Sequence, residues 1–111
     1  MKLTILAAAA AALLLAALPA AAATPTFKGT VGPGFTITMA SKPTKSGTVK
    51  LVVSDLSDIH NFHLKGPGVD VKTTIGGKGS KTFTVTLKKG KYTFVCDPHA
   101  TSMKGSFTVA I

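Results

Sequence analysis

Glycine and proline interrupt this chain frequently from residue 24 onward, and the segments between them are short. These segments are rich in Val, Thr, Ile and Phe and alternate apolar with polar residues, a period of two that is typical of β-strands with one buried face. No segment shows helical periodicity. Several short strands separated by turns predict an all-β sandwich or barrel. The predicted strands are Phe35–Met39, Thr48–Ser54, Ile59–Leu64, Lys81–Leu87, Lys91–Cys96 and Gly105–Val109, with a weaker one at Phe27–Val31.

Residues 1–23 differ from the rest of the chain in composition. A lysine near the start precedes an apolar run from Leu3 to Leu18, Pro19 ends the run, and the alanines that follow offer small-residue cleavage sites. A retained membrane anchor is the alternative, but the run is shorter than the ~20 residues that span a bilayer core. No cysteine lies directly after the run, where a lipid anchor would be attached. We therefore predict a secretory signal peptide over 1–23 and one domain over 24–111, located in the periplasm or outside the cell.

The predicted mature domain is strongly basic. The full chain has a formal net charge of +9, and removing the leader with its one lysine leaves twelve lysines, no arginine and four aspartates, a formal charge of +8. Such a field favours acidic partners and speeds encounter with them. It does not indicate nucleic acid, because the lysines are scattered and arginine, the forked donor that recognises bases and phosphates, is absent. We expect transient acidic protein partners, no nucleic acid and no stable membrane insertion.

The only cysteine, Cys96, is followed closely by His99 and Met103. An exported chain with one cysteine forms no intramolecular disulfide, so Cys96 is either a buried structural residue or a metal ligand. Thiolate and thioether are soft donors that suit copper(I), while imidazole also suits copper(II). Zinc sites use Cys, His and carboxylates but not thioether. The donor set therefore predicts one copper ion that is held in both oxidation states and can carry an electron.

The geometry that matches these donors is a trigonal plane of two histidines and one cysteine with a long axial methionine, and it needs a second imidazole. The candidates are His60 and His63. In a strand over Ile59–Leu64, His60 shares a face with Phe62 and Leu64, whereas His63 lies on the other face. Because the Phe and Leu face is predicted to be buried, we assign His60 as the ligand. We expect His63 to be an exposed or partly packed imidazole.

With these residues in place, the sequence resembles the cupredoxin family of small blue copper proteins, which includes plastocyanin, amicyanin and pseudoazurin. The resemblance covers residues 24–111, and within the family the sequence looks most like bacterial plastocyanin-like domains. It implies a Greek-key β-sandwich of about seven to eight strands with one type 1 copper. The segments that carry it are His60-Asn61, Tyr92–Cys96 and the pattern Cys96-x-x-His99-x-x-x-Met103-x-Gly105.

The resemblance also implies a role for individual residues. His60, Cys96 and His99 would be the equatorial ligands and Met103 the axial one. In the family, the asparagine beside the first histidine helps to tie the two ligand loops together, which implies this role for Asn61.

The expected function is that of an exported, monomeric single-electron carrier. An enzyme is not expected, because a copper filled by four ligands has no open position for substrate. A copper delivery or buffering protein, which passes the ion itself to a cuproenzyme, is the alternative. Delivery proteins generally show open Met- and His-rich surface sites, whereas the mature domain has only two Met and three His. A sandwich that binds no metal would leave the coincidence of Cys, His and Met unexplained.

The electron is expected to pass through the ring edge of His99, which lies on a loop between Pro98 and Ala100. We expect an apolar docking patch around this edge, ringed by some of the lysines and completed by the turns Gly32-Pro33-Gly34 and Gly66-Pro67-Gly68.

Overall fold

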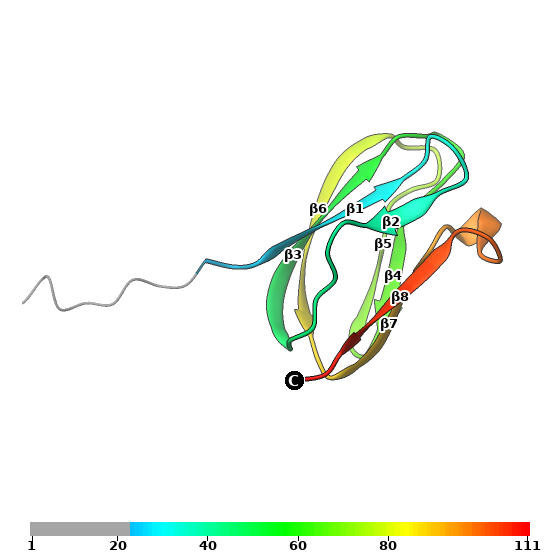
Figure 1. Cartoon of the computed structure of the whole chain (residues 1–111). Helices are drawn as coiled ribbons and strands as arrows, with labels where there is room; N and C mark the ends of the chain where they lie inside the picture. Colours follow the sequence, from blue (N-terminus) through cyan, green and yellow to red (C-terminus); the bar gives the residue numbers. More distant parts are fainter. Residues whose placement is uncertain (1–22) are drawn as a thin grey trace, which may run out of the picture.

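The computed structural model describes residues 23–111, so the predicted signal peptide lies outside the described residues except for Ala23. Within this part of the chain, no helix is long and apolar enough to cross a membrane. The domain consists of eight strands and one short 3-10 helix (Figure 1). In chain order these are β1 (Thr26–Val31), β2 (Ile37–Met39), β3 (Gly47–Asp55), β4 (His63–Gly66), β5 (Val69–Lys72), β6 (Gly79–Leu87), β7 (Gly90–Val95), η2 (Asp97–His99) and β8 (Lys104–Val109).

The strands form two four-stranded sheets that pack face to face (Figure 1). One sheet has the order β2-β1-β3-β6 and the other has the order β5-β4-β7-β8. Strands β1 and β3 run parallel, and every other neighbouring pair is antiparallel. The predicted all-β sandwich of seven to eight strands is therefore confirmed.

Four loops meet at one end of the sandwich, and the C-terminus lies at the other end (Figure 1). The registers explain this arrangement, because the last residues of β1 and β3 pair with each other, and the first residue of β4 pairs with the last residues of β5 and β7. The loops at this end comprise residues 32–36, 56–62, 73–78 and 96–103.

The aromatic face of β7 anchors this end of the domain. Tyr92 and Phe94 are buried on one face, and Cys96 follows them in the same alternation with no exposed surface. Phe94 stacks on Phe62 with ring centroids 5.5 Å apart, and Tyr92 stacks on Phe107 at 5.2 Å. Such pairs add about 0.5–1.5 kcal/mol each beyond the apolar area they bury. The end of β7 that carries the cysteine is thus held by the core itself.

Gly105 lets the chain return from the Cys96 loop into the sheet. It pairs with Phe94 across β7 and β8, and a Cβ at this position would overlap the Phe94 ring. Glycine is required here by the close approach of an aromatic side chain, because its backbone does not adopt a positive φ.

The prediction of a strand over Ile59–Leu64 is wrong in its first four residues. Strand β4 begins only at His63, and residues 56–62 form a loop. His60, Asn61 and Phe62 are all buried in succession, so inward and outward faces do not alternate there. His60 is buried as predicted, but its burial does not come from alternation along a strand. The loop turns inward because Phe62 packs in the core and its N–H donates to Thr73 Oγ1 at 2.8 Å.

Strand β5 was not predicted from the sequence. It is only four residues long, and Val69 is its one buried residue. A segment of this length between two turns carries too little alternation to be recognised. Apart from β4 and β5, the strands lie within two residues of their predicted bounds.

Candidate metal centre

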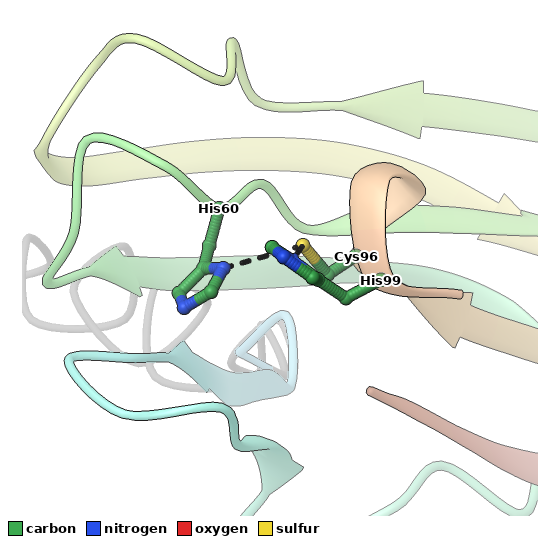
Figure 2. Close-up of side chains that lie close together, drawn as sticks. All are labelled: His60, Cys96 and His99. Carbon is green, nitrogen blue, oxygen red and sulfur yellow. Dashed lines mark hydrogen bonds between the residues drawn. The ribbon is translucent and has the colours of Figure 1, made fainter. Parts of the chain in front are cut away.

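Three of the predicted ligands meet at the loop end of the sandwich. The Sγ atom of Cys96 lies 3.6 Å from Nδ1 of His60 and 3.5 Å from Nδ1 of His99. The three donor atoms all lie within 4.8 Å of one another. Figure 2 shows both imidazoles turned toward the sulfur, with His60 entering from one loop and Cys96 and His99 from another. Residues far apart in the sequence are thereby brought into one donor cluster.

These distances fit a metal ion bound between the donors. Bonds of about 2.0–2.3 Å to imidazole nitrogen and thiolate sulfur, set at trigonal angles, place neighbouring donors roughly 3.5–3.8 Å apart. The two sulfur–nitrogen distances lie in this range. Hydrogen bonding alone gives little reason for the convergence, because one thiol offers a single weak donor proton to two imidazoles.

Met103 belongs to the same buried loop. Its side chain is 1% exposed. Its N–H donates to the carbonyl of His99 at 2.8 Å, and its own carbonyl accepts the N–H of Cys96 at 3.0 Å. These two bonds close the segment between Cys96 and Met103 into a compact turn. The thioether, the thiol and one imidazole are therefore held on a single braced loop.

The two histidines of the cluster differ in exposure. His60 is completely buried, whereas His99 is half-buried. Phe35 lies edge-on to both rings, with centroids 5.1 Å from His60 and 5.0 Å from His99, although it is itself 62% exposed. The sequence placed Phe35 in a strand, but β2 begins only at Ile37. Phe35 is thereby free to lie in the loop over the two imidazoles, a position that strand alternation does not reveal.

Gly32 makes room for the buried imidazole. Its φ of +73° lies in a region that residues with a side chain rarely adopt. A Cβ there would lie 3.3 Å from Cδ2 of His60 and 3.0 Å from Cβ of Ser57. The turn after β1 thus approaches the His60 loop more closely than a larger residue would allow.

Asn61 ties the two ligand loops together, as the resemblance implied. Its Nδ2 donates to Oδ2 of Asp97 at 2.8 Å, and its Oδ1 accepts the N–H of Asp97 at 2.8 Å. A third bond joins Nδ2 to the carbonyl of Thr73 at 3.3 Å. Since Asn61 follows His60 and Asp97 follows Cys96, these bonds fix the two segments that carry the predicted ligands relative to each other.

Asp55 is a buried carboxylate where the His60 loop begins. Its Oδ1 accepts the N–H of Ser57 at 3.0 Å. Burial raises the pKa of Asp55, and the hydrogen bond from Ser57 opposes the rise. Among the described residues, Asp55 Oδ2 and His60 Nε2 are the two buried side-chain atoms without a hydrogen-bond partner. The polar groups of this loop are therefore less completely satisfied than those of the Cys96 loop.

His63 lies outside the donor cluster, and the expectation of a partly packed imidazole is borne out. Its side chain is 13% exposed. Its Nε2 lies 2.6 Å from Oδ1 of Asp70, and its Nδ1 lies 2.8 Å from Oδ1 of Asp97. The sequence gave no sign of these two carboxylate partners, because Asp70 lies on the strand that was not predicted.

A two-sheet β-sandwich in which two histidines and a cysteine converge at the loop end is the arrangement expected of a small single-domain copper protein. The chain belongs to the cupredoxin family, since the family described as cupredoxin-like domain matches residues 5–109. Comparison with functionally curated proteins gives no match.

Solved structures of other proteins share the fold, among them the following two. Reduced rusticyanin has a TM-score of 0.61 and 24% sequence identity, with 81% of each chain covered. Auracyanin from the photosynthetic bacterium Roseiflexus castenholzii, reduced with Na-dithionite, has a TM-score of 0.56 and 21% identity, with 81% of this chain and 100% of the other covered. At these identities the likeness concerns the fold.

Family membership confirms the predicted cofactor, one copper ion. The donors present agree with this metal, because a thiolate and two imidazoles converge in space and a buried thioether lies on the same loop.

The link between the two ligand loops can be tested by replacing Asn61 with Leu. The variant keeps a similar side-chain volume but leaves the N–H of Asp97 and the carbonyl of Thr73 without their partners. We expect the free energy of unfolding of the metal-free protein, measured with denaturant, to fall by about 1–3 kcal/mol.

The control is Thr48→Val, which removes the exposed hydrogen bond of 3.1 Å between Thr48 and Thr86. Because both hydroxyls face water, this change should cost less than about 0.5 kcal/mol. An Asn61→Leu protein no less stable than the Thr48→Val protein would contradict a bracing role for Asn61.

Proposed function

We propose that this protein is an exported single-electron carrier with one type 1 copper, ligated by His60, Cys96, His99 and Met103. The observation that carries the proposal is the convergence of two imidazole Nδ1 atoms on one thiol sulfur at 3.5 and 3.6 Å. When bound, copper supplies a one-electron change between Cu(I) and Cu(II). Rusticyanin and auracyanin, which share the fold, were both solved in reduced forms, which supports a redox role for this fold.

The bracing of the ligands supports electron transfer. The Cys96 loop is closed by backbone bonds to Met103, and Asn61 joins it to the His60 loop. Ligands held in one geometry move little when the oxidation state changes, so the energy needed to reorganise the site is small. A small reorganisation energy makes electron transfer fast.

The burial of the donors favours retention of the ion over its delivery. Cys96 and His60 have no exposed surface, Met103 has 1%, and only His99 is partly exposed. A delivery protein must hand its ion to another set of ligands and therefore needs an open site. The closed site and its filled ligand set also argue against an enzyme, because they provide no position for a substrate.

An apolar surface around the metal end would serve as the docking site for redox partners. Five large apolar side chains are exposed in the described residues, and four of them lie on the loops at this end. These four are Phe35, Leu56, Ile59 and Ile75. Pro98 and Ala100 are also exposed, beside His99. Carriers need small, transient contacts, which such a patch ringed by lysines would provide.

One part of the predicted patch is misplaced. The turn Gly66-Pro67-Gly68 joins β4 to β5 at the end of the sandwich opposite the donors, because β4 runs away from the metal end. This turn therefore does not border His99. The exposed Phe35, which the sequence assigned to a strand, occupies the metal end instead.

Export remains part of the proposal. It rests on the signal-peptide pattern of residues 1–23 and on the lone thiol, which suits an oxidising compartment only if it is buried or bound. Cys96 is completely buried.

Copper binding is tested with the oxidised, copper-loaded domain. It should hold one copper per chain and show the intense visible band of thiolate-to-copper charge transfer. Cys96→Ser should abolish the band while leaving the fold intact, because oxygen replaces the only thiolate. Metal analysis measures the copper content, the visible spectrum measures the charge-transfer band, and circular dichroism reports on the fold.

The matched histidine pair gives the control. His60→Ala should lose the band, whereas His63→Ala should retain copper and most of the band, because His63 contributes no donor to the cluster. A blue Cys96→Ser protein, or equal loss from both histidine variants, would refute the ligand assignment.

The role of Met103 is tested by Met103→Leu. Removing a weak donor that helps to stabilise copper(II) and making the site more apolar should raise the reduction potential, as measured by voltammetry. Met39→Leu is the control, because Met39 is a core residue of β2 and should leave the potential unchanged. An unchanged or lowered potential in Met103→Leu would show that the thioether is not a ligand.

The docking surface is tested by stopped-flow electron transfer to an acidic c-type cytochrome. The rate should fall as salt is raised, because screening weakens attraction between the basic domain and its partner. Ala100→Glu should slow transfer at every salt concentration, since it places a charge beside His99. Ala110→Glu adds the same charge near the opposite end and should have a much smaller effect. A rate that rises with salt and ignores Ala100→Glu would rule out this docking site.

A further inference from the structure

Within residues 23–111, the copper site leaves one cluster of ionisable side chains unused. His63 begins β4, Asp70 lies on β5, and Asp97 directly follows Cys96. The imidazole stands between the two carboxylates, with one ring nitrogen 2.6 Å from Asp70 and the other 2.8 Å from Asp97. An imidazole thus bridges an edge strand and the turn that carries two of the proposed ligands.

The number of protons on the ring follows from these contacts. Ionised carboxylates accept hydrogen bonds and cannot donate them, and a neutral imidazole has one N–H and one lone pair. A neutral His63 would therefore set a lone pair against one carboxylate at hydrogen-bonding distance. Only the imidazolium form donates to Asp70 and Asp97 at the same time.

The surrounding charges agree with a protonated ring. Partial burial acts to lower the pKa of His63, but the hydrogen bonds and charges of Asp97 and Asp70 outweigh it, so the pKa lies above its ordinary value. The hydrogen bond from His63 lowers the pKa of Asp70. Partial burial acts to raise the pKa of Asp97, but the bonds from His63 and Asn61 outweigh it and lower the pKa. Lys65 and Lys72 are the other charged groups that act on the cluster, through the aspartates.

The carboxylate of Asp97 connects this cluster to the ligand loops. Its Oδ1 contacts His63, its Oδ2 accepts from Asn61, and its backbone N–H donates back to Asn61. Both carboxylate oxygens are therefore engaged, and the side chain cannot rotate without breaking one of these bonds. Asp97 is therefore held on two sides, by Asn61 in the interior and by His63 nearer the surface.

We propose that His63 is a positioning residue of the metal loop, held as an imidazolium between Asp70 and Asp97 so that it fixes the turn carrying Cys96 and His99. The proposal rests on the proposed function only in taking those two residues as copper ligands. Loss of the proton or of the ring frees one oxygen of Asp97 and removes a positive charge near the site. Both changes should alter the reduction potential.

The pH range of the bridge follows from the directions of the shifts. A histidine with a raised pKa contributes its full stabilisation below its unfolded value of about 6.5 and loses it as pH rises through the folded pKa. Asp70, whose pKa is lowered, contributes its stabilisation above its unfolded value of about 3.9 and loses it as pH falls through the folded value. The bridge is therefore complete between about pH 4 and 6.5.

The imidazolium is tested by NMR on the metal-free protein, independently of copper. At about pH 6 both ring nitrogens of His63 should carry protons. Asp70→Asn removes one carboxylate from a side chain that is 61% exposed, so the fold should survive while the pKa of His63 falls. Asp58→Asn removes another exposed carboxylate and should leave that pKa nearly unchanged. A singly protonated ring, or equal behaviour of the two variants, would overturn the bridge.

The positioning role is tested by voltammetry of the copper-loaded domain. In the wild type, the potential should fall as pH rises through the His63 pKa, because a nearby positive charge is lost. His63→Gln should keep the visible band, have a lower potential at about pH 6, and lack this pH step. A His63→Gln protein with the wild-type potential and pH profile would overturn the positioning role. Absence of the visible band in the wild type would overturn the proposed function while leaving the NMR result standing.

Discussion

The reciprocal hydrogen bonds between Asn61 and Asp97 are the constraint on which the rest of the site depends. Each residue directly follows a proposed ligand, so the two bonds of 2.8 Å set the distance between the His60 and Cys96 segments. The core supports both sides of this link, because Phe62, which follows Asn61, stacks on Phe94, which lies three residues before Asp97. Apolar packing fixes the strands, and the polar link transfers that order to the loops beyond them.

The site combines a closed interior with one partly open edge. Three of the proposed ligands are almost completely buried, and His99 alone reaches toward the surface beneath the exposed ring of Phe35. This arrangement suits the movement of an electron better than the movement of an ion, because an electron can pass through a ring edge while the donors stay in place. The bridge from Asp70 through His63 adds an outer brace whose strength depends on pH.

The sequence predicted the sandwich and the residues that meet at its end, but part of the reasoning failed. Strand periodicity located most strands within two residues. It could not show that His60 lies in a loop, because burial in a loop depends on packing and hydrogen bonds to distant residues such as Thr73. Phe35 and the partners of His63 were missed for the same reason. Their positions are set by contacts between loops that are far apart along the chain.

The sequence by itself determined the class of fold and the chemistry of the donors. Short segments with period-two alternation favour packed sheets, and a thiolate, imidazoles and a thioether are together the donor types that suit copper. Only the tertiary structure decided which imidazole joins Cys96 and which one braces Asp97. His60 and His63 are chemically identical and three residues apart, so their roles differ only through the point at which β4 begins and the groups that the folded loops place beside each ring.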